Sequence, residues 1–288
     1  MIKATIIKDS ISNGVRITTV ELEYPRFIHS ELMTHRVFSR NAASSRAIPA
    51  KKVRKQVWNN PEQPIHWGEN QRGMQASQEL IGLKRRLAQI FWHGASKVAC
   101  MLHWGMEKVG LHKQASNRIL ESYQTMKVLV TSTEWANFLW LRDHEDAQPE
   151  IRELAVQLDS SLNNSNPTTL GYKEWHLPYV TDEMKDTMSL DDQLAVSVSC
   201  CAQVSYRLLD VSLDKAQKIM DSLTSGSRVH ASPFEHQATP IPNFQRLTKT
   251  KAKRLGVTHV DMDDQRWSGN FRGWIQHRQL IKGHAITK

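Results

Sequence analysis

Residues 34–46, with the sequence THRVFSRNAASSR, gather many hydrogen-bond donors in a short stretch that contains no acidic residue. The polar members are His35, Arg36, Ser39, Arg40, Asn41, Ser44, Ser45 and Arg46. Guanidinium groups make forked contacts with phosphate, and serine hydroxyls together with the backbone amides of a turn can complete an anion-binding nest. The pattern therefore indicates an anion site, and a solvated basic loop is the alternative that composition leaves open.

The charge balance of the whole chain also favours an anionic partner. Among 288 residues, 38 Lys and Arg stand against 29 Asp and Glu, which gives a formal net charge of +9. Such an excess attracts phosphates on a small molecule or on a nucleic acid, and it does not separate the two. We interpret the basic runs 51–55 and 246–254 as solvated faces, with nucleic-acid contact as the alternative.

Composition is that of an ordinary globular protein. Hydrophobic residues make up 40% of the chain and charged residues 23%, which excludes disordered and fibrous classes. Three cysteines without a C-x-x-C spacing argue against a disulfide scaffold and a zinc ribbon. The acidic and histidine cluster at 144–146 is typical of a solvated helix start, so no metal site is expected. Because no stretch has the length of a membrane span and the N-terminus lacks signal-peptide features, we expect a cytoplasmic protein without a membrane partner.

The elements that must position residues 34–46 follow from the hydrophobic pattern. Two β-rich runs, 2–7 and 15–22, are joined by Ser-Asn-Gly, which predicts a hairpin. The other predicted elements are a helix over 27–38, two helices between 75 and 106 that are divided at Gly94, a strand over 126–133, a helix over 134–141 with a capping box of Thr131 and Glu134, and a helix over 151–158. The mixture predicts an α+β fold, with a mixed sheet and flanking long helices.

The stretch 34–46 resembles the signature of the flavin-dependent thymidylate synthases, R-H-R-x-x-S-x-N-E-x-S-x-R. The identical positions are His35, Arg36, Ser39, Asn41, Ser44 and Arg46. The departures are Thr34 in place of the leading Arg and Ala42 in place of the Glu. This resemblance implies a flavin-dependent thymidylate synthase-like fold and a single catalytic domain over 1–288. Residues 159–192 are rich in Ser, Asn, Thr and Pro and show no clear period, so we expect a linker or a long loop there.

Three further blocks resemble segments of the same family. NFLWLRDHEDAQPEIRELA at 137–155 is similar to its N-F-L-x-L-R and A-Q-x-E-I-R segments, CAQVSY at 201–206 to A-R-V-S-Y/F, and HASPFEH at 230–236 to H-x-S/T-P-F-E-H. In the family the last two segments precede the arginine-rich signature, whereas here they follow it. The order therefore predicts a circular permutation.

The resemblance implies that FAD is the cofactor and that several separate parts of the chain hold it. The implied cofactor-binding residues are His35, Arg36, Val37, Asn41, Asn137, Ser205, His230, Ser232 and Glu235. The implied substrate-binding residues are Glu31, Ser44, Ser45, Arg46, Arg118 and Arg142. Of these, Arg142 would contact the pyrimidine ring, and Arg142 and Ser44 are the candidate catalytic residues.

The implied reaction transfers a one-carbon unit from methylenetetrahydrofolate to carbon 5 of dUMP, which gives dTMP, while NADPH regenerates the reduced flavin. The implied partner is thus a pyrimidine deoxynucleoside monophosphate rather than a nucleic acid, and the family's homotetramer implies the same assembly here. Glu31 stands where the family has Gln near the nucleotide, and an unpaired acid beside a phosphate is unfavourable. Three alternatives stay open: a hydroxymethylase acting on dUMP or dCMP, a non-catalytic nucleic-acid-binding protein, and an inactive structural subunit.

Overall fold

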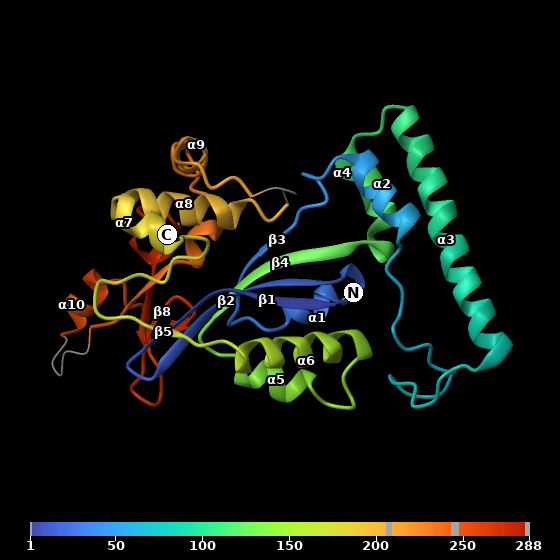
Figure 1. Ribbon diagram of the computed structural model, residues 1–288, viewed down its shortest axis with the longest axis horizontal. Coiled ribbons are helices and arrows are strands. Elements are labelled where there is room, and N and C mark those ends of the chain that lie inside the picture. The colour runs from blue at the N-terminus through green and yellow to red at the C-terminus, as the bar shows by residue number, and fades with distance from the viewer. Residues whose placement is uncertain (1, 206–208, 243–247, 286–288) are drawn as a thin grey trace.

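The computed structural model describes residues 2–205, 209–242 and 248–285. Tyr206, which ends the CAQVSY block, and Arg246, which begins the second basic run, lie outside the described residues. A five-stranded sheet in the order β3-β4-β2-β1-β5 forms the centre of the molecule (Figure 1). Its strands are β1 (Lys3–Ser12), β2 (Val15–Pro25), β3 (Ser39–Ala42), β4 (Thr125–Ser132) and β5 (Thr168–Thr169).

The sheet is mixed, because β1 to β4 pair antiparallel whereas the short β5 runs parallel to β1. The predicted hairpin is confirmed, and its turn has Asn13 and Gly14 at positive φ angles of 48° and 76°. Two successive positive φ angles define the turn type whose twist matches that of the flanking strands, and Asn-Gly is its preferred sequence.

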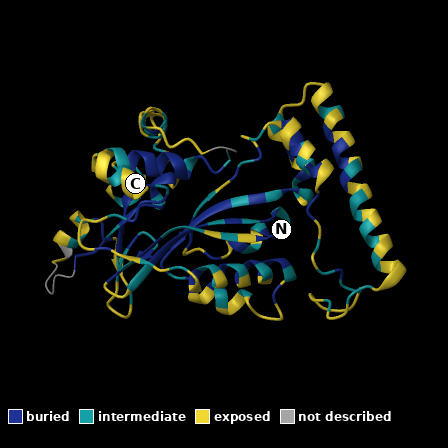
Figure 2. Ribbon diagram, viewed as in Figure 1, coloured by how far each residue is buried: buried dark blue, intermediate teal, exposed yellow. Residues whose placement is uncertain are grey.

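Three helices cover one face of the sheet: α1 (His29–Met33), α5 (Ala136–Arg142) and α6 (Pro149–Asn163). Alternate residues of the central strands, such as Val20 and Val130, are fully buried against Ile151, Leu154 and Leu158 of α6. Figure 2 shows the matching division of α6 into a buried inner side and an exposed outer side. This amphipathic packing holds α6 against the sheet, and α5, which ends at Arg142, packs on α6.

Helix α8 (Leu190–Ala202) contacts the other face of the sheet near β3 and β4. Cys201 and Val204 pack against Ala43 and Leu129 in a small apolar cluster. Helices α7 (Asp182–Thr187) and α9 (Leu213–Thr224) pack beside α8. Residues 164–181, between α6 and α7, contain only β5 and an isolated bridge at His176.

A projecting arm at one end of the molecule consists of α2 (Ala50–Asn59), α3 (Gly82–Lys108), α4 (Lys113–Ser116) and the 3-10 helix η2 (Asn117–Tyr123). Helix α3 packs on α2 and η2 through Ala99, Cys100 and His103. Its opposite side carries exposed apolar residues, which include Leu87, Ile90, Phe91 and Val98. Both sides of this helix are therefore apolar, and residues 2–205, 209–242 and 248–285 cover only one of them.

The C-terminal part forms two small sheets beside the central one. The first pairs β6 (Ala238–Pro240) with β10 (Trp274–Gln276), and the second joins β7 (His259–Val260), β8 (Arg266–Ser268) and β9 (Phe271–Arg272). The remaining elements are the helix α10 (Lys249–Arg254) and the 3-10 helices η1 (Arg26–Ile28), η3 (Ser232–Glu235) and η4 (His277–Leu280).

The predicted α+β class with a mixed sheet and long helices is confirmed, but some element boundaries were wrong. The predicted helix over 27–38 ends at Met33, because Arg40 Nη1 donates to the carbonyl oxygens of Leu32, Met33 and His35, and the chain then enters β3. The predicted break at Gly94 is also wrong, since α3 continues through it. An interior glycine costs only about 1 kcal/mol, which the packing of this long helix offsets.

The predicted capping box at 131–134 does not form. Thr131 belongs to β4, Glu134 makes an ion pair with Arg272, and the N-cap of α5 is Trp135 without a side-chain hydrogen bond. Thr131 and Glu134 therefore bond to residues far away in the sequence and do not form the capping box. No helix within the described residues is both long enough and apolar enough to cross a membrane.

Candidate functional site

Arg142, at the end of α5, is held by side chains from the first helix and the loop that follows it. Its Nε donates to Nε2 of His35 at 3.1 Å, Nη1 donates to a carboxylate oxygen of Glu31 at 3.2 Å, and Nη2 donates to Oγ1 of Thr34 at 3.3 Å. About a fifth of the Arg142 side chain is exposed. The guanidinium is therefore fixed in orientation while one side of it still reaches solvent.

The protonation state of His35 is set by its surroundings. Burial is the main cause that lowers the pKa of His35 to about 4, and the positive charges of Arg142 and Arg40 act in the same direction. The ring is therefore neutral near pH 7. Because Nε2 accepts the hydrogen bond from Arg142, the ring proton must be on Nδ1.

The surroundings of Glu31 act on the pKa of its carboxyl group in both directions. Burial raises the pKa of Glu31, and the nearby charge of Glu150 raises it further, although Arg142 opposes both effects. Arg142 is the cation that compensates the carboxylate at this position. The predicted conflict between an acid and an anionic ligand is thus reduced by an ion pair inside the chain.

The signature stretch also contacts the CAQVSY block. Asn41 Nδ2 donates to the carbonyl oxygen of Cys201 at 3.0 Å, and the backbone N–H of Ser44 donates to Ser205 Oγ at 2.8 Å. These contacts join residues about 160 positions apart in sequence. The Ser44 hydroxyl itself has no hydrogen-bond partner within the described part of the chain.

Ser45 and Arg118 meet at a shared carboxylate. Ser45 Oγ lies 3.4 Å from Glu121 Oε1, Arg118 Nη1 donates to the same oxygen at 2.8 Å, and Arg26 Nη2 lies 3.0 Å from it. Arg118 is more than half exposed. The sequence spacing gave no secure place for Arg118, and the structure puts it beside the predicted anion loop.

Other predicted site residues are exposed and have no side-chain hydrogen bond or ion pair among residues 2–205, 209–242 and 248–285. They are Arg36, Arg46, Asn137, His230 and Ser232. Val37 is also exposed, at 39%. Glu235 is different, because its carboxylate is paired with Arg278. Arg36 and Arg46 therefore supply two free guanidinium groups at the surface, and Asn137, His230 and Ser232 supply free polar groups.

A buried chain of hydrogen bonds crosses the sheet beneath this region. His176 Nε2 lies 2.8 Å from Thr19 Oγ1, Thr19 Oγ1 lies 2.7 Å from Thr131 Oγ1, and Thr131 Oγ1 lies 2.8 Å from Nδ1 of His236. Both imidazoles are fully buried, and burial lowers the pKa of each to about 3. His236, the last residue of the HASPFEH block, is therefore a neutral structural group that ties this block to β4.

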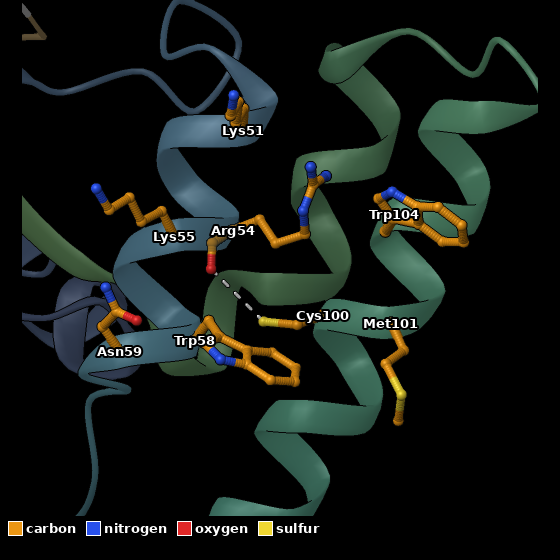
Figure 3. Close-up of a pocket in the computed structure, with 8 residues that line it drawn as sticks. All are labelled: Lys51, Arg54, Lys55, Trp58, Asn59, Cys100, Met101 and Trp104. Carbon is orange, nitrogen blue, oxygen red and sulfur yellow. Dashed lines mark hydrogen bonds between the residues drawn. The ribbon is translucent and has the colours of Figure 1, made fainter.

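The cavity between α2 and α3 has a volume of about 400 Å³ and lies in the projecting arm. Figure 3 shows Trp58 and the Cys100 thiol between the two helices, whereas Lys55 and Asn59 extend away from α3. None of the predicted site residues lines it. In the part of the chain that the structure describes, no group of three or more His, Cys, Asp or Glu side chains is arranged to hold a metal ion.

Sequence reasoning missed residues in the last part of the chain, which contact the site. Asn270, Gln276 and Arg278 bond to Val37, Ser39 and Glu235. No motif pointed to them, because the resemblance ends before Pro240 and their contacts with the predicted site residues are all long-range. Their contacts with the signature stretch can be identified only in the folded structure.

Comparison with known proteins gives a family match and several remote structural likenesses. The family model described as thymidylate synthase complementing protein matches residues 15–168. No curated protein matches significantly. The match covers the signature stretch and the block at 137–155, and it does not reach the two C-terminal blocks.

Among solved structures, the chain is similar to a UMP/dUMP methylase, PolB, from Streptomyces cacaoi bound with 5-Br dUMP, with 16% identity over 56% of this chain and 90% of that one and a TM-score of 0.44. The same protein bound with 5-Br UMP gives 15% identity, 56% and 88% coverage and a TM-score of 0.45. The flavin dependent thymidylate synthase ThyX from Helicobacter pylori, complexed with FAD and dUMP, gives 17% identity, 51% and 67% coverage and a TM-score of 0.35.

Proposed function

The chain belongs to the thymidylate synthase complementing protein family, and from this premise we propose that it modifies carbon 5 of a pyrimidine deoxynucleotide in a flavin-dependent reaction. The specific reaction that we propose is the conversion of dUMP to dTMP. Methylenetetrahydrofolate would donate the one-carbon unit, and NADPH would be the reductant.

The observation that carries the proposal is the contact of Arg142 with His35. It joins the signature stretch to the second family block across 107 positions of sequence, at a distance of 3.1 Å. The bonds from Asn41 and Ser44 to residues 201 and 205 bring a third block to the same loop. Such convergence of remote polar segments is what a composite nucleotide site requires.

The residues present fit a flavin and a phosphorylated nucleotide. Arg36 and Arg46 have no partner in the described chain, and a free, exposed guanidinium can bind phosphate through two parallel hydrogen bonds. We propose that Ser44, Ser45, Arg46 and Arg118 hold the nucleotide phosphate.

The exposed polar groups of the other blocks are suited to the cofactor. We propose that FAD is held by the residues that the family resemblance implies, which are His35, Arg36, Val37, Asn41, Asn137, Ser205, His230, Ser232 and Glu235. The flavin, when bound, supplies the redox chemistry.

Arg142 is the proposed catalytic residue. Carbon 5 of uracil becomes a better nucleophile when negative charge that develops on the ring is stabilised, and a fixed guanidinium at the carbonyl edge provides that stabilisation. Neutral His35 accepts from Nε and Thr34 accepts from Nη2, so both orient the guanidinium without adding charge. For Ser44, which has a free hydroxyl, we propose contact with the nucleotide rather than nucleophilic attack.

A second candidate reaction is hydroxymethylation of dUMP or dCMP at the same site. The observation that favours it is the ion pair of Glu31 with Arg142, because a carboxylate beside the ring-binding guanidinium can accept a hydrogen bond from the exocyclic amino group of cytosine. Turnover with dUMP and dCMP, with the products read by mass, separates the two reactions.

We further propose a single domain over 1–288 in circularly permuted order and a homo-oligomer, with a homotetramer as the family precedent. The long-range bonds from the signature stretch to residues 201 and 205 support the permuted order. The exposed apolar side of α3, which includes Leu87, Ile90 and Phe91, supports association with another copy.

The test is turnover of dUMP by the purified protein with FAD, methylenetetrahydrofolate and NADPH. We expect a product heavier by one methylene unit, and Arg142→Ala should abolish its formation while flavin absorbance is retained. A colourless protein that forms no product and binds DNA in a salt-sensitive manner would contradict the proposal and favour the nucleic-acid-binding alternative.

A further inference from the structure

The C-terminal segment 266–280 contacts three parts of the chain that carry candidate site residues. It contains β8, a tight turn at Gly269 and Asn270, β9, β10 and η4. Gly269 has a φ of +61°, a backbone conformation that favours glycine, and a Cβ added there would lie 2.4 Å from Gln276 Oε1, so a side chain at this position would displace the Gln276 amide. The turn thereby brings the side chains of Asn270 and Gln276 together.

Asn270 bonds to the signature stretch on two sides. Its Nδ2 donates to the carbonyl oxygen of Val37 at 3.0 Å, and its Oδ1 accepts from Ser39 Oγ at 3.1 Å. The same Oδ1 accepts from Gln276 Nε2 at 2.8 Å. Asn270 thus fixes the backbone between the exposed Arg36 and the start of β3.

Gln276 connects the signature stretch to the HASPFEH block. It is 1% exposed, and its Nε2 lies 3.0 Å from Ser39 Oγ and 3.2 Å from the carbonyl oxygen of Glu235. Ser39 itself is fully buried. A buried amide whose partners are all satisfied has one geometry open to it, so the two blocks are held in a fixed relation.

The same segment also reaches the third block. Arg272 Nε donates to Glu134 at 2.6 Å, and its backbone N–H donates to Thr133 Oγ1 at 3.1 Å, just before the helix that carries Asn137 and Arg142. Arg278 pairs with Glu235. All these contacts originate outside residues 15–168, the range that the family model matches.

We propose that Asn270 and Gln276 are positioning residues, which hold the 34–42 loop and the 232–236 turn in the arrangement that a ligand between them requires. The identity of that ligand as a flavin rests on the proposed function. The hydrogen bonds alone support the inference that this segment orders the two loops, whatever the ligand is.

The test compares Asn270→Ala and Gln276→Ala with Gln265→Ala, a control at the exposed position just before this segment, where the hydrogen bonds of Gln265 stay within residues 261–265. Amide hydrogen exchange of the whole chain is measured by mass spectrometry. We expect exchange within 34–42 to become about tenfold faster in both variants, since each removes hydrogen bonds to Ser39 or Val37. Exchange within 232–236 should become about tenfold faster in Gln276→Ala, which also removes the bond to the Glu235 carbonyl oxygen, while α6 and the control stay unchanged.

The second measurement is FAD affinity, followed by the visible absorbance of the bound flavin. We expect about tenfold weaker binding for Asn270→Ala and wild-type binding for Gln265→Ala. Unchanged exchange in both loops, or an equal acceleration in α6, overturns the proposal. Faster exchange with unchanged FAD affinity overturns the positioning role. If the wild-type protein binds no flavin, the proposed function fails and the exchange result alone decides whether the segment orders the loops.

Discussion

Acidification is expected to destabilise this protein through two histidines that cannot be protonated in the folded state. His176 and His236 are fully buried, and both are hydrogen-bonded in the chain through Thr19 and Thr131. Burial lowers the pKa of each from an ordinary value of 6.5 to about 3. The unfolded chain therefore takes up protons below about pH 6.5, whereas the folded chain does not do so until about pH 3.

The sign and size of the effect follow from proton linkage. Because the unfolded state binds more protons in this window, the stability that is present above pH 6.5 is lost as the pH falls. Each histidine changes the free energy of unfolding by about 1.4 kcal/mol per pH unit, or about 2 kcal/mol between pH 6.5 and pH 5. The two together cost about 4 kcal/mol, a large part of the roughly 5–15 kcal/mol that stabilises a typical domain.

Urea unfolding followed by far-ultraviolet circular dichroism at several pH values measures this slope. His176→Gln and His236→Gln should each reduce the slope by about 1.4 kcal/mol per pH unit, because a buried amide does not titrate. The matched control is His112→Gln, which removes an exposed imidazole that lies outside the buried chain of hydrogen bonds. A wild-type slope that both buried substitutions leave intact would refute the reasoning.

Three substitutions test other parts of the account. Arg142→Lys keeps the charge but not the three fixed donors, and we expect kcat for dUMP to fall by about 10²–10³ in steady-state assays while circular dichroism stays unchanged; normal kcat would argue against Arg142 as the catalytic group. Glu31→Gln removes the carboxylate that pairs with Arg142, and we expect a several-fold lower KM for dUMP with lower turnover of dCMP; a higher KM for dUMP would contradict this assignment. Thr131→Val breaks the buried link between Thr19 and His236, and urea unfolding should show a loss of about 2 kcal/mol, whereas wild-type stability would show that this link contributes nothing.

Local sequence signals predicted the elements whose determinants are local. The Asn13-Gly14 turn and the apolar run of β4 need no long-range information, and both formed as predicted. The length of α1 and the absence of the capping box at 131–134 were set by distant partners. Arg40 satisfies the carbonyl groups that end α1, and Arg272 takes the carboxylate that would have capped α5.

The candidate site also has features that the sequence predicts and features that depend on long-range contacts. The donors of residues 34–46 could be recognised by type, and Arg142 could be assigned by resemblance. The dependence of the site on Asn270 and Gln276 could not be predicted, because an isolated Asn or Gln in a sequence carries no signal of the backbone groups it will bind. Their partners, Val37 and Glu235, lie 233 and 41 positions away in the chain.

The central claim is that remote polar segments of this chain form one site for a flavin and a pyrimidine nucleotide. The visible absorption spectrum of the purified protein with FAD, recorded before and after addition of dUMP, tests it most directly. We predict a flavin spectrum that stays with the protein through gel filtration and shifts when dUMP is added. A protein that retains no flavin, or a bound flavin whose spectrum is indifferent to dUMP and dCMP alike, would contradict the claim.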